Sequence, residues 1–579
     1  MTSRYGSEVI VETLKALGIK YAAMNPGASW RGLHSSLVEK GSPELIMTLQ
    51  ENVAVAIAHG YAKASSEPMA AILHNLVGLQ TGSMGLFNAW INQTPMLVLG
   101  GSGPSNHMQR RPWIDWIHSA RPQSLIAREF AKWDDEPISA EGIPTSLLRA
   151  YKTAVAAPQG PTYVNFDALL QEENVEGRDI QIPAGPDLPG DISAPQADLE
   201  KLADILVGAQ RPVILADYVG RSHEGFDALR RLAEALWAPV VDCGGRHNFP
   251  TGHPLDQALR HTEMLEQADV VLTLDVRDLQ WSLGSIRHDT HSYELSIGSD
   301  TKVVGMSLTD LMNRGFLNRE AIHPADHMLT ADTRVALPAL ADLVEQRSPD
   351  RASREAWVQE QADIHAQRVA GVRAETGVPS VITPPKVVAA AWDVVRGTPY
   401  QMAYAGTAPG GQTYRHLRSA FELEEFNCNL GPSGGAGLGY GLGAAIGAAL
   451  AHKDDDTFVL SLQADGDAMY TPQALWTAAH HQLPLLLVIL NNRSYGQDRM
   501  HQTLVTRDRG SDLSKVPIGI DIEGPQVDFA GLARSQGVEG FGPVADPAAL
   551  GETFAAAAKV VREEGRPALV DVVLPQPEF

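Results

Sequence analysis

The segment 457–492 constrains the fold most, because it has the pattern of a strand, a helix and a second strand joined by short turns. TFVLSLQ (457–463) and PLLLVIL (484–490) are apolar runs of strand length. The stretch between them, 471–481, begins with a Thr-Pro pair that is typical of the N-cap and first turn of a helix. Two strands joined by a crossover helix lie parallel in a sheet. The segment therefore predicts an α/β fold with doubly wound parallel sheets.

Polar side chains stand directly after both of these strands. Asp465 and Gly466 follow the first strand, and Asn492 closes the second. Because open α/β sheets bind ligands beyond the carboxyl ends of their strands, we expect Asp465 and Asn492 at one ligand-binding edge. A carboxylate and an amide offer the hard oxygen atoms that Mg²⁺ prefers, and a glycine lets the backbone approach a phosphate. The alternative is that Asp465-Gly466 is a plain turn and Asn492 a polar strand end.

Two other blocks of the chain alternate strand and helix patterns in the same way, which predicts three α/β domains. The first domain, 1–180, is followed by a Pro/Gly-rich linker, 182–195. The central domain is expected at 196–345, and a charged helical segment, 346–375, leads to the third domain at 384–579. Strands of the central domain are expected at PVILAD (212–217), APVVD (238–242), VVLTLD (270–275) and KVVGM (302–306).

The charge and the cysteine content of the chain indicate which binding partners and which cellular compartment to expect. With 46 basic and 69 acidic residues the formal net charge is −23, which argues against nucleic acid and against an anionic membrane surface. The two cysteines, Cys243 and Cys428, are too few for a disulfide framework or a cysteine-based zinc site. The N-terminal stretch has an amphipathic helix pattern rather than that of a signal peptide, and no apolar run reaches membrane-spanning length. We therefore expect a cytoplasmic enzyme.

Titratable side chains also follow two predicted strands of the first block. ELIMTLQ (44–50) leads to Glu51, and MAAILH (69–74) ends on His74. If these strands are parallel, Glu51 and His74 share one edge of the sheet. Each residue has a plainer interpretation, because a glutamate in a first helical turn stabilises the helix dipole and a lone histidine at a strand end is more often structural.

The segment ADGDAMY…LNNRSYG resembles the cofactor motif of the thiamine-diphosphate enzymes, in which Gly-Asp-Gly is followed by Asn-Asn after one strand–helix–strand excursion. The resemblance implies that Asp465 and the Asn492 amide bind Mg²⁺, with the Ser494 carbonyl as a third ligand, and that Gly466 and Asp467 lie beside the diphosphate. A carboxylate beside a phosphate is repelled unless it points away or meets a cation, so the role of Asp467 stays open.

Further cofactor contacts follow from the same resemblance. Leu438, in GPSGGAGLGYGLG, matches the bulky aliphatic residue that bends thiamine into its V shape, although close helix packing is an equal interpretation of this Gly-rich stretch. Gly406 and Thr407, in YAGTAPGGQ, are candidates for a phosphate loop, with a turn that holds no ligand as the alternative. Asn25, after the strand YAAM (21–24), and Tyr495, after the metal loop, complete the candidate cofactor contacts.

The catalytic candidates are Glu51, His74 and Ser29. ENVAVAIAHGYAKA matches the family pattern in which a glutamate shares a proton with N1′ of the aminopyrimidine, which favours the reactive form of the cofactor. LHNLVGLQTGSMG is similar to benzoylformate decarboxylase, where the residue matching His74 assists proton transfer. Ala28 stands where that enzyme has a substrate-binding serine, and Ser29 is the adjacent candidate. Trp113, Trp116 and His118 are expected either to line the site or to form a packing or interface cluster.

The resemblance implies pyrimidine-binding, central and diphosphate-binding domains in that order, with the cofactor between two subunits of a homodimer or homotetramer. We expect a Mg²⁺-dependent thiamine-diphosphate enzyme that decarboxylates a 2-oxo acid without oxidation, as benzoylformate decarboxylase does. The alternative is a carboligase that resembles acetolactate synthase, or another C–C lyase, acting on a 2-oxo acid or aldehyde. Alternatives of another class are a non-catalytic cofactor-binding homologue and, more generally, a Rossmann-type dehydrogenase. FAD is not expected, because no glycine-rich fingerprint follows VILAD (213–217).

Overall fold

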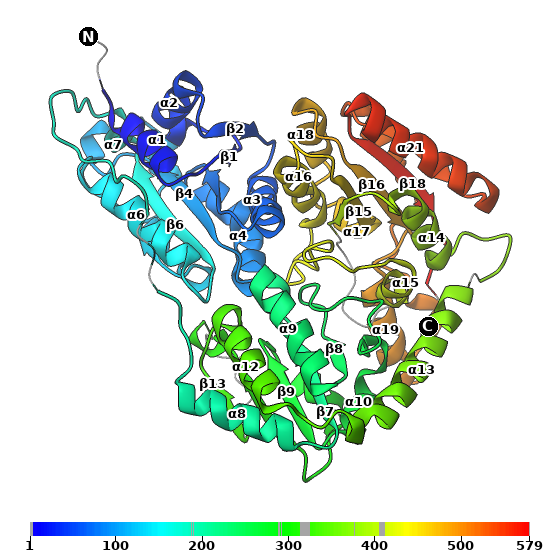
Figure 1. Ribbon diagram of the computed structural model, residues 1–579. Coiled ribbons are helices and arrows are strands. Elements are labelled where there is room, and N and C mark those ends of the chain that lie inside the picture. The colour runs from blue at the N-terminus through cyan, green and yellow to red at the C-terminus, as the bar shows by residue number, and fades with distance from the viewer. Residues whose placement is uncertain are drawn as a thin grey trace.

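The computed structural model describes residues 4–577 except 187, 189, 288–289, 291, 313–324, 376 and 404–411. Within these ranges the strands form three large sheets that are covered by helices. The first and third sheets lie side by side and the central one lies below both of them (Figure 1). Almost all strand pairs in the large sheets are formed across helical crossovers and all are parallel, so the predicted doubly wound α/β fold is confirmed.

The first sheet has helices on both faces. Its strand order is β2 (Glu44–Met47), β1 (Tyr21–Met24), β3 (Met69–Leu73), β4 (Met96–Ser102), β6 (Pro161–Asp167) and β5 (Asp134–Asp135). Helices α1 (Gly6–Ala16), α2 (Arg31–Lys40) and α6 (Gly142–Val155) pack on one face. Helices α3 (Glu51–Ser65) and α4 (Asn75–Ile91) pack on the other. Because β2 and β3 both pair with β1 in parallel, the residues that follow them meet at the same edge of the sheet.

The central sheet contains the strands predicted for this part of the chain. Its order is β13 (His327–Leu329), β12 (Lys302–Met306), β9 (Val270–Leu274), β7 (Pro212–Ala216) and β8 (Val240–Asp242). Helices α8 (Gln196–Gly208), α9 (His223–Leu236) and α12 (Thr333–Arg347) cover one face, and α10 (His261–Gln267) covers the other. The long helix α13 (Ala352–Ala374) then leads toward the third sheet (Figure 1).

The third sheet contains the strand–helix–strand unit expected at 457–492. Its order is β14 (Tyr400–Met402), β15 (Phe458–Ala464), β16 (Leu486–Asn491), β18 (Ala568–Val573) and β17 (Glu539–Val544). The helix between β15 and β16 is α18 (Ala474–His480) with Gln473 as its N-cap, so the expectation that Thr471 is the N-cap and Pro472 the first helical residue was wrong. The Thr471 hydroxyl does not cap this helix but donates to the Gly439 carbonyl at 3.2 Å.

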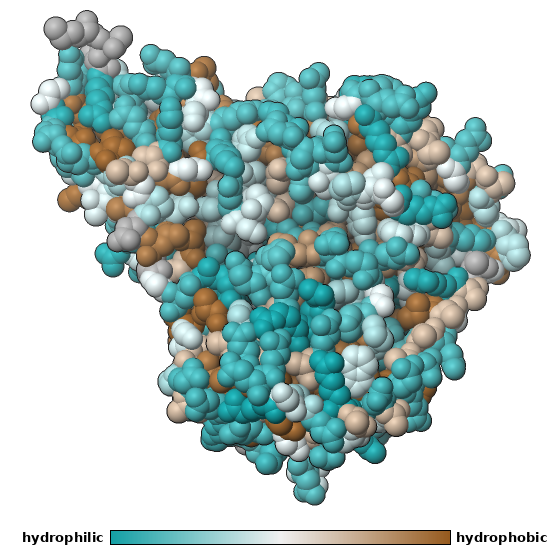
Figure 2. Space-filling view, viewed as in Figure 1, coloured by the Kyte–Doolittle hydropathy of each residue, from teal (hydrophilic) through white to brown (hydrophobic). Residues whose placement is uncertain are grey.

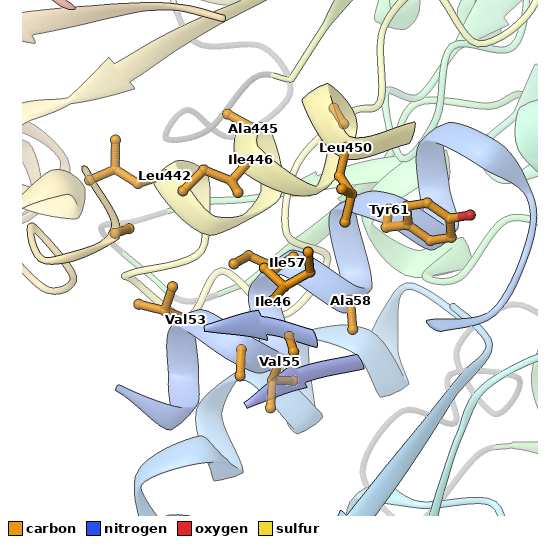
Figure 3. Packing of buried hydrophobic residues seen from close by; sticks show 14 of the residues in the cluster. Ile46, Val53, Val55, Ile57, Ala58, Tyr61, Leu442, Ala445, Ile446 and Leu450 are labelled. Carbon is orange, nitrogen blue, oxygen red and sulfur yellow. The ribbon is translucent and has the colours of Figure 1, made fainter. Parts of the chain in front are cut away.

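Helices α3 and α16 (Gly441–Ala451) pack along each other and join the first and third sheets in one hydrophobic core. Figure 3 shows Val53, Ile57 and Tyr61 of α3 facing Leu442, Ile446 and Leu450 of α16. Burial of each such large side chain contributes about 1.5–3 kcal/mol. The approach is close because both helices present small residues, and a β-carbon on Gly60 would overlap the backbone of Ala444. This contact sets the two carboxyl-end edges relative to each other.

The visible surface of the chain is mainly hydrophilic, with smaller hydrophobic patches among polar side chains (Figure 2). Such a surface fits the net charge of −23. Among the described helices, none combines the length and the hydropathy that crossing a bilayer demands.

Candidate active site

Glu51 is the first residue of α3 and lies at the carboxyl edge of the first sheet. The Gln50 side chain caps the helix by accepting a hydrogen bond from the Val53 N–H at 3.0 Å. Only 7% of Glu51 is exposed, and its carboxylate lies against α4, where a β-carbon on Gly78 would come within 2.7 Å of Oε1. Across the described part of the chain no cationic side chain pairs with this carboxylate, so it remains available to a ligand.

His74 lies at the start of α4, one turn from Gly78. Its Nδ1 is 2.9 Å from the Ser29 hydroxyl, and a β-carbon on Gly27 would collide with the imidazole ring. Burial lowers the pKa of His74, and the nearby His118 and Arg111 lower it further. The ring is therefore held in place and favours the neutral form, which leaves Nε2 as the ring nitrogen that Ser29 does not engage.

Ser29 is buried, and its hydroxyl has two partners. Besides meeting His74, it accepts a hydrogen bond from the Asn75 N–H at 3.2 Å, and the Ser29 carbonyl accepts one from the Gln171 amide at 2.8 Å. The side chain thus orients His74 and the start of α4. Ala28 is exposed, and Asn25 is half-buried at the end of β1. The structure places Glu51, His74 and Ser29 at one edge of the first sheet.

Asp465 begins the short helix α17 (Asp465–Ala468), directly after β15, and is buried. One carboxylate oxygen accepts from the Gly466 N–H at 2.8 Å and the other from the Arg493 N–H at 2.6 Å. The Asn492 amide oxygen accepts from the Ser494 N–H at 2.9 Å. Burial raises the pKa of Asp465 to about 6, although the backbone N–H groups oppose the shift. The loops after β15 and β16 are therefore connected through these side chains.

The residues at this edge fit a magnesium ion. Asp465 is a buried carboxylate that meets only backbone N–H groups in the described part of the chain, so its charge lacks a counter-ion. The Ser494 hydroxyl is buried there without a hydrogen-bond partner. Carboxylate, amide and carbonyl oxygens form the hard donor set that Mg²⁺ prefers beside a phosphate. The Tyr495 ring packs on Gly466, where a β-carbon would come within 2.7 Å of the ring.

The Asp467 carboxylate accepts hydrogen bonds from a different part of the chain than the Asp465 carboxylate does. Its two carboxylate oxygens accept from the backbone N–H groups of Gly439, at 2.8 Å, and Gly441, at 3.2 Å. Burial raises the pKa of Asp467, and these hydrogen bonds offset only part of that rise. Asp467 thus holds the Gly-rich segment at the start of α16 and satisfies N–H groups that have no partner within the helix. The half-buried Leu438 lies directly before this anchor.

Asn88 of α4 and Asn92, which directly follows α4, also hold the Gly-rich segment, although neither was among the predicted site residues. Asn88 donates to the Gly437 carbonyl at 3.0 Å and accepts from the Gly437 N–H at 3.1 Å, and Asn92 donates to the Pro432 carbonyl at 2.9 Å. The available signal was that these two asparagines, one helical turn apart, are the polar residues of the apolar stretch 85–92. Gly406 and Thr407 lie outside the described residues.

A further segment, residues 105–121, follows β4 and reaches the same edge. The His118 ring meets the His74 ring edge to face, with centroids 5.9 Å apart. The indoles of Trp113 and Trp116 are 70% and 71% exposed, so they do not pack into the core of the single chain. The interpretations of these indoles as site-lining or interface residues stay open.

The buried Asp465 carboxylate beside the half-buried Asn492 amide lies at one sheet edge, and the buried Glu51, which has no cationic partner among the described residues, lies at another; this arrangement is typical of a cofactor-dependent α/β enzyme. The chain belongs to the thiamine pyrophosphate enzyme family. Models of the N-terminal TPP binding domain, the central domain and the C-terminal TPP binding domain match residues 4–122, 199–305 and 410–572.

Relatives of known activity cover nearly the whole chain. Benzoylformate decarboxylase of Pseudomonas aeruginosa is 26% identical over 573 residues, which are 97% of each chain. The acetolactate synthase large subunit of Haemophilus influenzae is 23% identical, over 92% of this chain and 88% of that subunit. The structure of a thiamine diphosphate-dependent 4-hydroxybenzoylformate decarboxylase of Rhodococcus jostii RHA1 has a TM-score of 0.77 at 22% identity, over 99% of this chain and 100% of that chain, which shows the shared fold. The protein is thus a thiamine-diphosphate-dependent enzyme related to these decarboxylases and carboligases.

Proposed function

We propose that the protein is a non-oxidative decarboxylase of a 2-oxo acid. The observation that carries this proposal is the position of His74, which Ser29 and Gly27 hold at the edge where Glu51 lies. A neutral imidazole beside a buried carboxylate supplies the two proton-transfer groups that such a reaction needs. The sequence around His74 is also the part that resembles benzoylformate decarboxylase.

In this proposal the third sheet holds the cofactor through Mg²⁺. Asp465, the Asn492 amide and the Ser494 carbonyl bind the ion, and Gly466 allows the diphosphate to approach the backbone. Leu438 and Tyr495 are the proposed contacts to the rest of the cofactor, and Asn25 is one from the first domain. When bound, thiamine diphosphate would supply a carbon nucleophile for the substrate carbonyl and a sink for the electron pair of the C–C bond that is cleaved.

Side chains of the first domain carry out the proton transfers in this proposal. Glu51 holds a proton at N1′ of the aminopyrimidine, and His74 delivers protons to the substrate. The overall reaction converts R–CO–COO⁻ and one proton into R–CHO and CO₂. The low exposure of Glu51 limits water access, which strengthens its interaction with a bound ligand.

We also propose a homodimer or homotetramer in which a partner completes each site. In this arrangement the first domain, 1–180, faces the third domain, 384–579, of a second copy, and the central domain, 196–345, connects them. Cytoplasmic location stays a prediction of the sequence. Mass photometry of the purified protein measures the assembly, and a monomer that is fully active would contradict the shared site.

The test of the function is CO₂ release from a panel of aliphatic and aromatic 2-oxo acids, with thiamine diphosphate and Mg²⁺ present. We expect release and an aldehyde product for at least one acid. A carboligase is the second candidate, because the chain matches acetolactate synthase over most of its length, and a new C–C product with an added aldehyde would favour it. If no 2-oxo acid releases CO₂ or forms such a product, the proposal fails. A yellow colour of the purified protein would reveal a flavin.

A further inference from the structure

Lys63 is a buried lysine near the end of α3 to which neither the family resemblance nor the proposed function gives a role. Only 2% of it is exposed. Its Nζ donates to the Pro432 carbonyl at 2.8 Å and to the Gly431 carbonyl at 3.3 Å. In the ranges that the structure describes, no carboxylate pairs with this amine. The side chain is therefore engaged by the backbone of the Gly-rich segment, residues 431–439, rather than by a counter-ion.

The third domain binds the end of α3 in return. The Asn427 side-chain amide donates to the carbonyls of Lys63 and Ala64, both at 2.9 Å. These carbonyls lie in the last turn of α3, where the helix itself offers no further N–H groups. The same end of α3 is thus connected to the third domain by donors from both sides.

The backbone of the Gly-rich segment needs such contacts to keep its shape. The segment lies outside the helices and strands. It passes through the left-handed region of backbone conformation at four positions, Gly431, Gly434, Ala436 and Gly439. Glycine adopts this conformation readily, but at Ala436 it costs free energy that surrounding contacts must offset. Because no regular ladder of hydrogen bonds holds the segment, side chains such as Lys63 determine its path.

Lys63 contacts the segment at its start and just beyond its end. Besides the two carbonyls at the start, its Nζ lies 5.5 Å from the centroid of the Tyr440 ring, and Tyr440 is the N-cap of α16. Leu438 lies between these contacts. Burial lowers the pKa of Lys63, and the nearby Arg246 and Arg277 lower it further. An amine keeps N–H donors in both protonation states, so its hydrogen bonds to the carbonyls do not depend on its charge.

We propose that Lys63 is a positioning residue for the cofactor: its hydrogen bonds fix the Gly-rich segment and thereby hold Leu438 against the thiamine part. The inference rests on the proposed function, in which Leu438 contacts that part while Asp465 and Gly466 hold the diphosphate with Mg²⁺. The two parts of the cofactor therefore depend on different segments of the chain, and only one of these segments is fixed by Lys63.

The test measures the Kd of thiamine diphosphate and of inorganic diphosphate by calorimetry, each with Mg²⁺. Lys63→Met keeps the apolar stem and removes the donors. We expect its Kd for thiamine diphosphate to rise at least about tenfold, because two buried hydrogen bonds are lost. Its Kd for inorganic diphosphate should be unchanged. Lys63→Gln keeps one amide, which cannot serve both carbonyls, so the same change should appear to a smaller extent.

Lys132→Met is the matched control. Lys132 is a half-buried lysine of the first domain whose Nζ also donates to two backbone carbonyls, those of Thr153 and Ala156. These carbonyls lie at the end of α6, which packs on the opposite face of the first sheet from α3. We expect a lower melting temperature for this control but an unchanged Kd of thiamine diphosphate.

The comparison of the two ligands separates a positioning role from a purely structural one. The inference is overturned if either Lys63 variant binds thiamine diphosphate as tightly as the unchanged protein, or if both ligands lose affinity alike. If Lys63→Met does not fold, Lys63→Gln gives the same decision. An unchanged protein that binds no thiamine diphosphate would refute the cofactor assignment of the proposed function. If the affinities change as expected but no 2-oxo acid releases CO₂, the proposed reaction fails and the role of Lys63 stands.

Discussion

Individual side chains at the edge of the first sheet carry the proposed chemistry, and their surroundings suit them to it. Glu51 begins α3, and α4 packs against its carboxylate and excludes water from it. No side chain of the described residues neutralises this carboxylate. A buried carboxylate that is already in position can exchange a proton with a ligand without a large rearrangement of water or protein around it.

Replacement of Glu51 by Gln keeps the shape and removes the ability to share a proton. We expect CO₂ release by Glu51→Gln to fall at least about 100-fold, because acid–base groups contribute on this scale. Cofactor binding, followed by calorimetry with thiamine diphosphate and Mg²⁺, should remain measurable. Glu44→Gln is the matched control, since Glu44 is exposed and pairs with Lys453. Full turnover by Glu51→Gln would refute the assigned role.

Ser29 is expected to act through His74. Ser29→Ala removes the hydroxyl at 2.9 Å from Nδ1, and a net hydrogen bond is worth about 0.5–1.5 kcal/mol. We expect kcat to fall by up to about tenfold, with a shifted pH profile and little change in KM. Ser83→Ala is the control on α4, because that hydroxyl only donates to the Leu79 carbonyl of its own helix. A raised KM with unchanged kcat would instead indicate substrate binding by Ser29.

At the scale of elements, the contact between α3 and α16 connects the sheet edge that holds Glu51 to the sheet edge that holds Asp465. Both helices are rich in alanine and glycine, so their axes approach closely and large side chains interdigitate on either side of the contact (Figure 3). Asp467, Asn88 and Asn92 then fasten the Gly-rich segment beside this contact. A change in helix separation would therefore move groups at both edges.

Gly60→Ala tests this contact. The added methyl group would overlap the backbone of Ala444, which cannot rotate away, and overpacking of this kind costs about 1–3 kcal/mol. We expect a lower melting temperature and weaker binding of thiamine diphosphate. Gly371→Ala is the control, since that exposed position of α13 has open space around it and alanine favours a helix by up to about 1 kcal/mol. Equal melting temperatures for the two variants would contradict the close contact.

At the scale of the whole molecule, buried polar groups connect the central and third sheets. Arg418 of α15 (Gln412–Ala420) is buried and pairs with Asp242 at 2.9 Å and with Asp256 at 3.1 Å. His247 lies nearby with both ring nitrogens buried and without partners in the described chain. Burial and Arg418 lower its pKa to about 4, although Asp242 opposes the shift. The His247 ring is therefore neutral in the folded chain at neutral pH.

This histidine should make the fold sensitive to acid. Between pH 6.5 and about 4 the unfolded chain binds a proton at His247 that the folded chain does not, so stability falls as pH falls through this window. From pH 7 to pH 5 the loss is about 2 kcal/mol. His247→Leu should lose less stability over this range in urea unfolding. His107→Leu, at an exposed position, should behave like the unchanged protein, and an equal loss in His247→Leu would contradict the prediction.

Much of the fold and part of the site were predictable from local sequence. Apolar runs of strand length marked the strands, and polar residues directly after them placed Asp465, Asn492, Glu51 and His74 at sheet edges. These features depend on the alternation of strand and helix and on the direction of parallel strands, which neighbouring residues specify. The start of α18 was misplaced because a Thr-Pro pair is compatible with both a cap and a preceding turn.

The sequence by itself determined the α/β class, the strands, the family and the residues at the two edges. Only the tertiary structure decided which distant side chains meet: Asp467 with the N–H groups of Gly439 and Gly441, Ser29 with His74, and His74 with His118. Local pattern follows from the backbone and from side chains a few residues apart. Contacts between segments depend instead on how closely helices and sheets pack, and that distance is set by the whole set of buried side chains.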